Sequence, residues 1–204
     1  MLAEGDDARL LWYANHPQGA SPTCSVFTIT AVRDGAAWER LALRAQKGDL
    51  QKWMRRMDDL RSEVESKLLV PLPWSPLQEV SFDNVPVDGR EHELSLCLED
   101  TMWPCENKFE EFIDRCGQVY AENVERPSSM GKIESAFQPA FGSHRRREVT
   151  LMQRIDRPES LLELLRTPLP PPYRAPGTWM HDALDQRDQW SSRLLRTAAW
   201  SPLF

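Results

Sequence analysis

The stretch at residues 53–77, WMRRMDDLRSEVESKLLVPLPWSPL, recurs 126 positions later at residues 179–203 as WMHDALDQRDQWSSRLLRTAAWSPL. Eleven of the 25 aligned positions are identical without a gap, including the Trp-Ser-Pro-Leu that ends each copy. A repeat with so long a period indicates two copies of a domain-sized unit and not a solenoid of short stacked repeats. Trp53 and Trp179, which open the two copies, should therefore both be buried against the sheets of their own units.

The second copy predicts a complete strand-helix-strand-strand-helix-strand unit. Leu94, Leu96 and Leu98 alternate with polar residues, as the buried face of a strand does. From Phe109 to Tyr120, apolar residues recur at the three- and four-residue spacing of an amphipathic helix. The expected strands are 92–99, 132–141, 147–155 and about 194–200, and the expected helices are 109–120, 161–165 and a further helix from about 177.

The first copy shows only the second half of this plan. Its expected elements are strands at about 10–15, 24–33 and 67–72, with helices at 38–45 and 50–64. Too few residues precede Leu10 to hold another strand and helix, so either an upstream segment is missing from these residues or the protein has lost it. The first strand of such a unit normally lies in the middle of its sheet, so its absence should leave unpaired backbone edges. Residues 79–85 either supply a substitute strand or form a linker.

The closing segment of the first copy carries a family resemblance. Residues 67–77, KLLVPLPWSPL, are similar to the closing segment of NIPSNAP-family domains, where an apolar strand ends in a proline-rich Ser-Pro-Leu. Residues 27–34 resemble the apolar strand of that family that precedes a helix, and residues 93–96 stand where its opening strand would be. The resemblance implies the dimeric α+β barrel superfamily, in which ferredoxin-like sheets pair face to face between subunits or between tandem units.

We therefore predict an α+β fold of tandem ferredoxin-like units in a dimeric α+β barrel-type arrangement. Residues 1–78 would form an incomplete NIPSNAP-like unit, residues 79–91 a linker or extra strand, and residues 92–204 a complete unit. The family resemblance implies a fold more than a reaction, because it carries no established chemistry with it.

Charge and composition narrow the function classes. The net charge of −6 argues against nucleic-acid binding, which needs a basic face to displace counterions from phosphates. The sequence shows no apolar stretch long enough to cross a bilayer and no signal-peptide pattern, which indicates a cytoplasmic protein. The four cysteines have neither C-x-x-C spacing nor a neighbouring histidine, so we expect reduced thiols and no metal site.

His16 is the best single candidate for a catalytic residue. It follows Trp12 and Tyr13 near the end of a predicted strand, in a loop expected at the barrel mouth. A neutral imidazole there could act as a general base, and the two aromatic rings could form a wall of a ligand site. The alternative is a surface histidine that happens to precede a turn proline.

The run His144-Arg145-Arg146-Arg147 is a local cationic cluster on an acidic protein. Arg145 and Arg147 could bind a carboxylate or phosphate group, since guanidinium groups bind such anions in bidentate fashion. A solvated hairpin turn is the alternative.

Two function classes remain open. One is a binding or interaction protein, whose barrel encloses a small apolar or aromatic ligand or nothing at all. The other is a cofactor-independent enzyme, such as a monooxygenase, cyclase or isomerase, that acts on an aromatic or polyketide-like substrate. The sequence contains no motif for a metal, flavin, haem or nucleotide, so no cofactor is expected. A homodimer is a further option for the assembly.

Overall fold

The computed structural model describes residues 6–17, 25–121, 130–142 and 146–204. Its strands are β1 (Ala8–Asn15), β2 (Val26–Val32), β3 (Leu69–Pro71), β4 (Leu96–Pro104), β5 (Gly131–Pro139), β6 (Val149–Ile155) and β7 (Arg187–Thr197). Its helices are α1 (Gly35–Lys47), α2 (Gln51–Asp58), α3 (Phe109–Arg115), α5 (Pro158–Arg166) and α6 (Trp179–Asp182). A π-helical turn (Cys116–Ala121) extends α3, and short 3-10 turns lie at Phe82–Asn84, Glu106–Lys108, Pro171–Arg174 and Ala183–Asp185.

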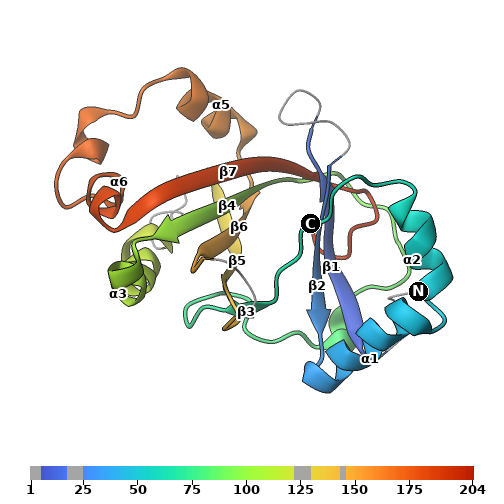
Figure 1. The fold of residues 1–204 in the computed structure, drawn as a ribbon. Coiled ribbons are helices and arrows are strands. Elements are labelled where there is room, and N and C mark those ends of the chain that lie inside the picture. The colour runs from blue at the N-terminus through green and yellow to red at the C-terminus, as the bar shows by residue number, and fades with distance from the viewer. Residues whose placement is uncertain (1–5, 18–24, 122–129, 143–145) are drawn as a thin grey trace.

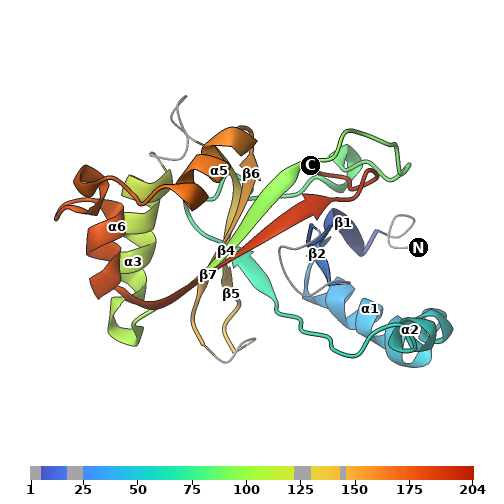
Figure 2. The same cartoon turned by 90° about the horizontal axis from the view of Figure 1, so that it is seen from above.

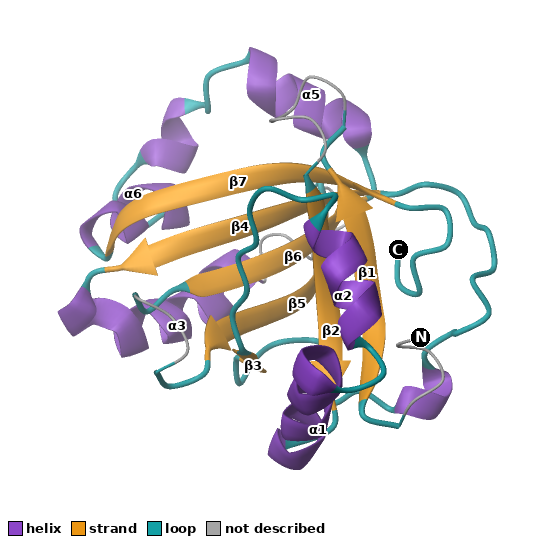
Figure 3. Cartoon of the chain, turned by 45° about the vertical axis from the view of Figure 1, so that its right-hand side comes forward, coloured by secondary structure: helices purple, strands orange, loops and turns teal. Residues whose placement is uncertain are grey.

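The seven strands form one antiparallel sheet in the order β2-β1-β7-β4-β6-β5-β3. The sheet curls into an open barrel, with β1 and β2 turned across the direction of the other strands (Figures 1 and 3). Helices α3, α5 and α6 lie on one side of the molecule, and α1 and α2 lie on the other side near β2 (Figure 2). The predicted α+β class is therefore confirmed.

Local sequence signals set the helix ends. The Asp34 carboxylate accepts a hydrogen bond from the Ala37 N–H at 2.7 Å and so caps the start of α1. Gly48 ends α1 and separates it from α2. Pro158 opens α5, where its missing N–H costs no helical hydrogen bond.

The β1–β2 hairpin and the β5–β6 hairpin have the same register. Adding 123 to each residue number of the first hairpin gives the second, so that the pair Ala8↔Val32 corresponds to Gly131↔Ile155. Each hairpin also has a register shift at the same place, between Leu10 and Trp12 in β1 and between the corresponding residues of β5. The repeat detected in the helix and closing strand thus extends to the hairpin, although identical residues are few there.

Each closing strand pairs with the hairpin of the other half of the chain. Strand β3 pairs with β5, and β7 pairs with β1 through Ala14↔Thr197. The Trp-Ser-Pro-Leu segment that follows each closing strand fixes this contact with its serine. The Ser75 hydroxyl accepts from the Ala136 N–H at 2.9 Å, and the Ser201 hydroxyl accepts from the Tyr13 N–H at 3.0 Å. The two halves are therefore interlocked through equivalent contacts.

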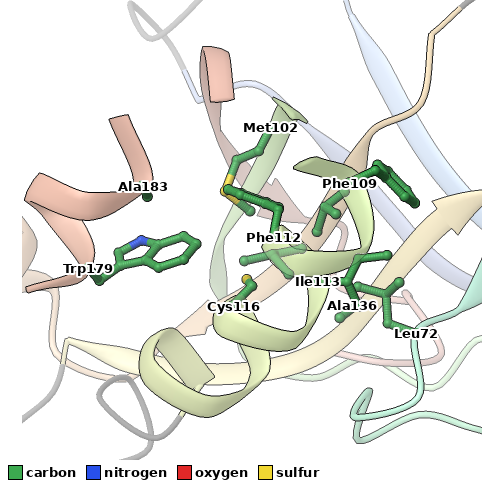
Figure 4. Close-up of a cluster of buried hydrophobic side chains, with 11 residues drawn as sticks. Leu72, Met102, Phe109, Phe112, Ile113, Cys116, Ala136, Trp179 and Ala183 are labelled. Atoms are coloured by element: carbon green, nitrogen blue, oxygen red, sulfur yellow. The ribbon is translucent and has the colours of Figure 1, made fainter. Parts of the chain in front are cut away.

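Two apolar clusters lie on opposite faces of the sheet. The outer core fills the space between the sheet and helices α3 and α6, and Figure 4 shows it. Its buried members include Leu72, Met102, Phe109, Phe112, Ile113, Cys116, Val149, Leu151, Trp179 and Ala183. The inner core lies on the face of the sheet turned away from α3 and α6, which we call the inner face. Its buried members are Leu11, Trp12, Ala14, Val85, Cys97, Met152 and Leu195, with Leu77 and Leu203 packed against them.

Several predicted elements differ in the structure. The strand predicted at 92–99 is β4 (Leu96–Pro104), and Leu94, expected on its buried face, lies before the strand and is 53% exposed. The helix predicted at 50–64 is α2 and ends at Asp58. Residues 79–85 are not a substitute strand, since they hold only the 3-10 turn Phe82–Asn84, and Phe82 and Val85 are buried. Strand β7 begins at Arg187, earlier than predicted, so Trp190 belongs to a strand and not to the preceding helix. The reason is β4, which pairs with β7 along its whole length and holds these polar residues in extended backbone.

The expectation that Trp53 is buried is wrong. Trp179 is 4% exposed and packs against Phe112 of α3 with ring centroids 5.3 Å apart, whereas Trp53 is 41% exposed. The physical reason is that the described part of the first copy contains no helix in the position of α3, so Trp53 has no equivalent of Phe112 to pack against.

Candidate functional site

The inner face carries a buried polar cluster beside the inner core. Strand pairing places Thr101 opposite Thr150, and Glu99 opposite Arg193. We use the name inner polar cluster for Lys67, Glu99, Thr101, Glu148, Thr150 and Arg193. Buried charges are costly unless they are paired, so the contacts of the two carboxylates decide what this cluster can do.

Both carboxylates of the cluster have cationic and hydroxyl partners. Glu99 is 1% exposed and accepts hydrogen bonds from Arg193 Nε at 2.5 Å and from Thr101 Oγ1 at 2.6 Å. Glu148 is equally buried and forms an ion pair with Lys67, while Thr150 Oγ1 lies 3.4 Å from it. These contacts neutralise both charges within the protein.

Burial and pairing act against each other on Arg193. Burial alone would lower the pKa of this guanidinium, but the hydrogen bond to Glu99 and the charge of that carboxylate outweigh it and raise the pKa above its ordinary value. Arg193 therefore stays charged in its contact with Glu99.

The segment between α2 and β3 crosses in front of the curled sheet (Figure 3). It brings Lys67 to Glu148. On the same face, Trp12, Met152 and Leu195 are buried. The inner face is thus occupied by packed and ion-paired side chains.

A third buried carboxylate, Asp100, points to the opposite face of β4. It accepts hydrogen bonds from Trp190 Nε1 at 3.1 Å and from the side chains of Ser192 and Gln153. These three donors tie β4 to both neighbouring strands, since Trp190 and Ser192 belong to β7 and Gln153 belongs to β6. The arrangement is that of a structural link within the sheet.

Among the described residues, the two buried cysteines are poor nucleophiles. Burial raises the pKa of Cys97 to about 11 and raises the pKa of Cys116 still further. Since the thiolate is the reactive form, neither side chain is suited to covalent catalysis near neutral pH.

The predicted aromatic wall is divided between two faces. Trp12 lies in the inner core, whereas Tyr13 packs against Trp200, with ring centroids 4.5 Å apart. Neighbouring residues of a strand point to opposite faces, so the two rings cannot line one site. His16 follows the end of β1, is partly buried, and its Nδ1 atom is buried without a hydrogen-bond partner. The catalytic and ligand-binding roles of these residues stay predictions.

Of the predicted cationic pair, Arg145 lies outside the described residues. Arg147 forms an ion pair with Glu110 of α3, and its guanidinium lies 3.7 Å from the centroid of the Phe109 ring. These contacts give Arg147 a structural role at the start of α3.

The second candidate site lies at the two ends of the sheet, β2 and β3. The sequence predicted unpaired backbone edges in the first copy but not the exposed side chains beside them. We use the name open side for β2, residues 60–71, Trp53 and Trp200. Strand β6 pairs with β5 and β4, but its counterpart β2 pairs only with β1 in the described part of the chain. Val26 of β2 is 58% exposed, while Val149, at the same place in β6, is fully buried.

Large apolar side chains are exposed along the open side. Trp200 is 43% exposed, whereas its counterpart Trp74 donates a hydrogen bond to the Ile113 carbonyl of α3 at 3.0 Å. Leu60 is 83% exposed. Large apolar side chains that are exposed together mark sites of interaction with a protein, a membrane or a ligand.

Two further findings concern the described residues alone. Within them, no helix is both long and apolar enough to span a bilayer. They also contain no group of three or more His, Cys, Asp or Glu side chains arranged to hold a metal ion.

Comparisons with models of protein families, with curated proteins and with solved structures find no match to this chain.

Proposed function

We propose that this chain is a cytoplasmic interaction protein built of tandem ferredoxin-like, NIPSNAP-like units, and that it binds a partner polypeptide through its open side. The observation that carries the proposal is a contrast between two surfaces. The inner face is filled by apolar side chains and internally neutralised charges, while the open side exposes Trp53, Leu60 and Trp200.

The strand order supports the tandem units. In the second half of the chain the order is β7-β4-β6-β5, so the first strand of the unit lies between the fourth and the third, as in a ferredoxin-like unit. The hairpin register and the serine contacts of the closing segment recur in the first half. That half lacks, among the described residues, a first strand and a first helix.

Energetics support a binding role for the open side. Burying a large apolar side chain contributes about 1.5–3 kcal/mol relative to leaving it in water. A partner that covers Leu60, which is 83% exposed, would gain most of such a contribution, and covering the exposed parts of Trp53 and Trp200 would add a fraction of it for each. Tryptophan is also among the residues that most often dominate the affinity of an interface.

The test is site-specific photo-crosslinking in cells that express the protein. A photoreactive amino acid replaces Leu60 or Trp200 in two variants and Trp38 in a control, because Trp38 lies on α1 and is similarly exposed. We expect a discrete crosslinked protein, identified by mass spectrometry, from the two open-side positions and not from the control. Absence of adducts at both positions would refute the interaction role.

A small-molecule site on the inner face, including one with cofactor-independent catalysis, is the second candidate. The observation in its favour is the buried His16 Nδ1 atom without a hydrogen-bond partner, just after β1, the strand that carries Trp12. A general base in such a site would use that nitrogen. Titration of flat aromatic compounds against tryptophan fluorescence, in the parent and in His16→Ala and Trp12→Ala variants, tests it. Binding that both substitutions weaken would favour this candidate over the first.

A further inference from the structure

We infer that the open side takes up a β-strand followed by an amphipathic helix from another polypeptide. The strand would lie between β2 and β3, and the helix would lie over Trp53 and Trp200 with a carboxylate facing Arg56. This inference rests on the proposed interaction function and names the chemistry of the partner. In the second half of the chain, β4 and α3 fill the corresponding place.

The strand that the first half lacks would lie between β2 and β3. Strand β4 lies between β6 and β7 and pairs with both in antiparallel fashion. The counterparts of β6 and β7 are β2 and β3, which are the two ends of the sheet. One further antiparallel strand between these ends would join them and close the barrel. Its backbone N–H and C=O groups would be satisfied by two neighbours, as those of β4 are.

The length of β3 supports this place. Strand β7 spans 11 residues, and most of them pair only with β4, since β1 reaches no further than Arg196 and Thr197. Strand β3 spans three residues, those that pair with β5. Residues 61–68, which correspond to the part of β7 that only β4 holds, form no strand. An added strand would allow β3 to extend backward through them.

The exposed tryptophans of the open side indicate a helix in the partner. In the second half, α3 packs between two tryptophans. Trp179 contacts Phe112, and Trp74 lies so close to Gly117 that a Cβ atom there would be 2.6 Å from the indole ring. Their counterparts in the repeat, Trp53 and Trp200, are 41% and 43% exposed. The partner helix therefore needs an apolar stripe with a small residue facing Trp200.

A third pair of equivalent residues, Gln186 and Leu60, indicates a more apolar stripe on the partner helix than on α3. Gln186 is buried and donates a hydrogen bond to Glu111 of α3 at 2.9 Å. Its counterpart in the first copy is Leu60, which is 83% exposed. Where α3 presents a glutamate, the partner helix should present an apolar side chain.

The charge that faces the helix position differs between the two halves. Asp182 of α6 forms an ion pair with Arg115 of α3. The residue at the position of Asp182 in the first copy is Arg56, which is exposed on α2. The charge on this side of the contact is thus inverted, so the partner helix should carry a carboxylate where α3 carries Arg115. Charge complementarity of this kind selects a partner more than it adds affinity.

The experiment uses this chain's own strand and helix as the probe. A fluorescein-labelled peptide of residues 92–121 is prepared in the parent form and with Arg115→Glu, together with a scrambled peptide of the same composition. Each is titrated, in reducing buffer, with the full chain and followed by fluorescence anisotropy. The chain is used as the parent and with Arg56→Glu, Trp53→Ala, Trp200→Ala and, as a matched control, Trp38→Ala.

We expect the Arg115→Glu peptide to bind the parent chain about tenfold more tightly than the parent peptide, and the Arg56→Glu chain to reverse this preference. Trp53→Ala and Trp200→Ala should each weaken binding by about tenfold or more, and Trp38→Ala should leave it unchanged. The reversal of preference cannot arise from loss of folding, because a misfolded variant would lose both peptides.

Equal binding of the scrambled peptide, or a preference that Arg56→Glu does not change, would overturn the inference. If the peptides fail while photo-crosslinks form at Leu60 and Trp200, the interaction function stands and the strand-helix partner is wrong. A crosslinked second copy of this chain would also overturn it and assign the open side to a homodimer. If neither peptide binding nor crosslinks are seen, both proposals fall.

Discussion

At the scale of single residues, Trp53 and Trp179 show how one sequence position can have two environments. Both open their copies of the repeat and both precede a methionine, yet Trp179 is 4% exposed and Trp53 is 41% exposed. The difference lies in the neighbour, since the Phe112 ring of α3 packs at a tilt against Trp179. The same residue at equivalent positions is therefore buried in one copy and exposed in the other.

This contrast predicts unequal effects of the same substitution. Trp179→Ala should cost about 3–5 kcal/mol of unfolding free energy, because it removes a buried aromatic side chain and leaves a cavity. Trp53→Ala should cost less than about 1 kcal/mol, as exposed substitutions usually do. Urea unfolding followed by circular dichroism measures both. Equal losses for the two variants would show that Trp53 is buried in solution, for example by self-association.

At the scale of elements, the Trp-Ser-Pro-Leu segment makes equivalent contacts in both copies of the repeat. Each serine hydroxyl accepts from a backbone N–H of the opposite hairpin and donates to the carbonyl two residues later, at 3.0 Å for Ser75 and 2.7 Å for Ser201. Both serines are buried. The segment therefore ends the closing strand and attaches it to the other half of the chain at the same time.

Ser75→Ala and Ser201→Ala should each lower stability by about 1–3 kcal/mol, because each removes the acceptor of a backbone N–H, that of Ala136 in a buried contact and that of Tyr13 in a partly buried one. Thermal unfolding monitored by calorimetry measures the loss. Ser62→Ala, at an exposed serine, is the control and should change nothing. A neutral effect of either buried substitution would mean that the corresponding contact between the halves does not form in solution.

At the scale of the whole molecule, the sheet has one end at β2 and the other at β3. Strand β2 has the same hairpin register as β6, but β6 is enclosed by β5 and β4. Edge strands have unpaired backbone groups on one side and open more readily than central strands. The two halves of the chain should therefore differ in local stability although they share a plan.

Native-state hydrogen exchange measures this difference. We expect the amides of β2 to exchange at least about tenfold faster than those of β6, since sub-global openings at a sheet edge need less free energy than global unfolding. Mass spectrometry of peptic fragments covering residues 26–32 and 149–155 provides the comparison. Equal protection in the isolated chain would indicate that the open side is already covered, by this chain or by a second copy.

The sequence by itself determined where most of the elements lie and contained the repeat. Periodicity located the hairpins and the helix at Phe109, and the shared Trp-Ser-Pro-Leu marked the two closing segments, because these signals depend on neighbours along the chain. The shortened first copy also predicted unpaired backbone edges, and the structure has sheet ends at β2 and β3.

Only the tertiary structure decided which strands pair and which side chains are buried. The inner polar cluster unites Lys67, Glu99 and Glu148 from distant segments, and no local pattern signals it. The division of Trp12 and Tyr13 between two faces and the exposure of Trp53 were likewise decided by contacts across the sheet. Local sequence fixes backbone preference, whereas burial depends on what another part of the chain, or another molecule, places opposite.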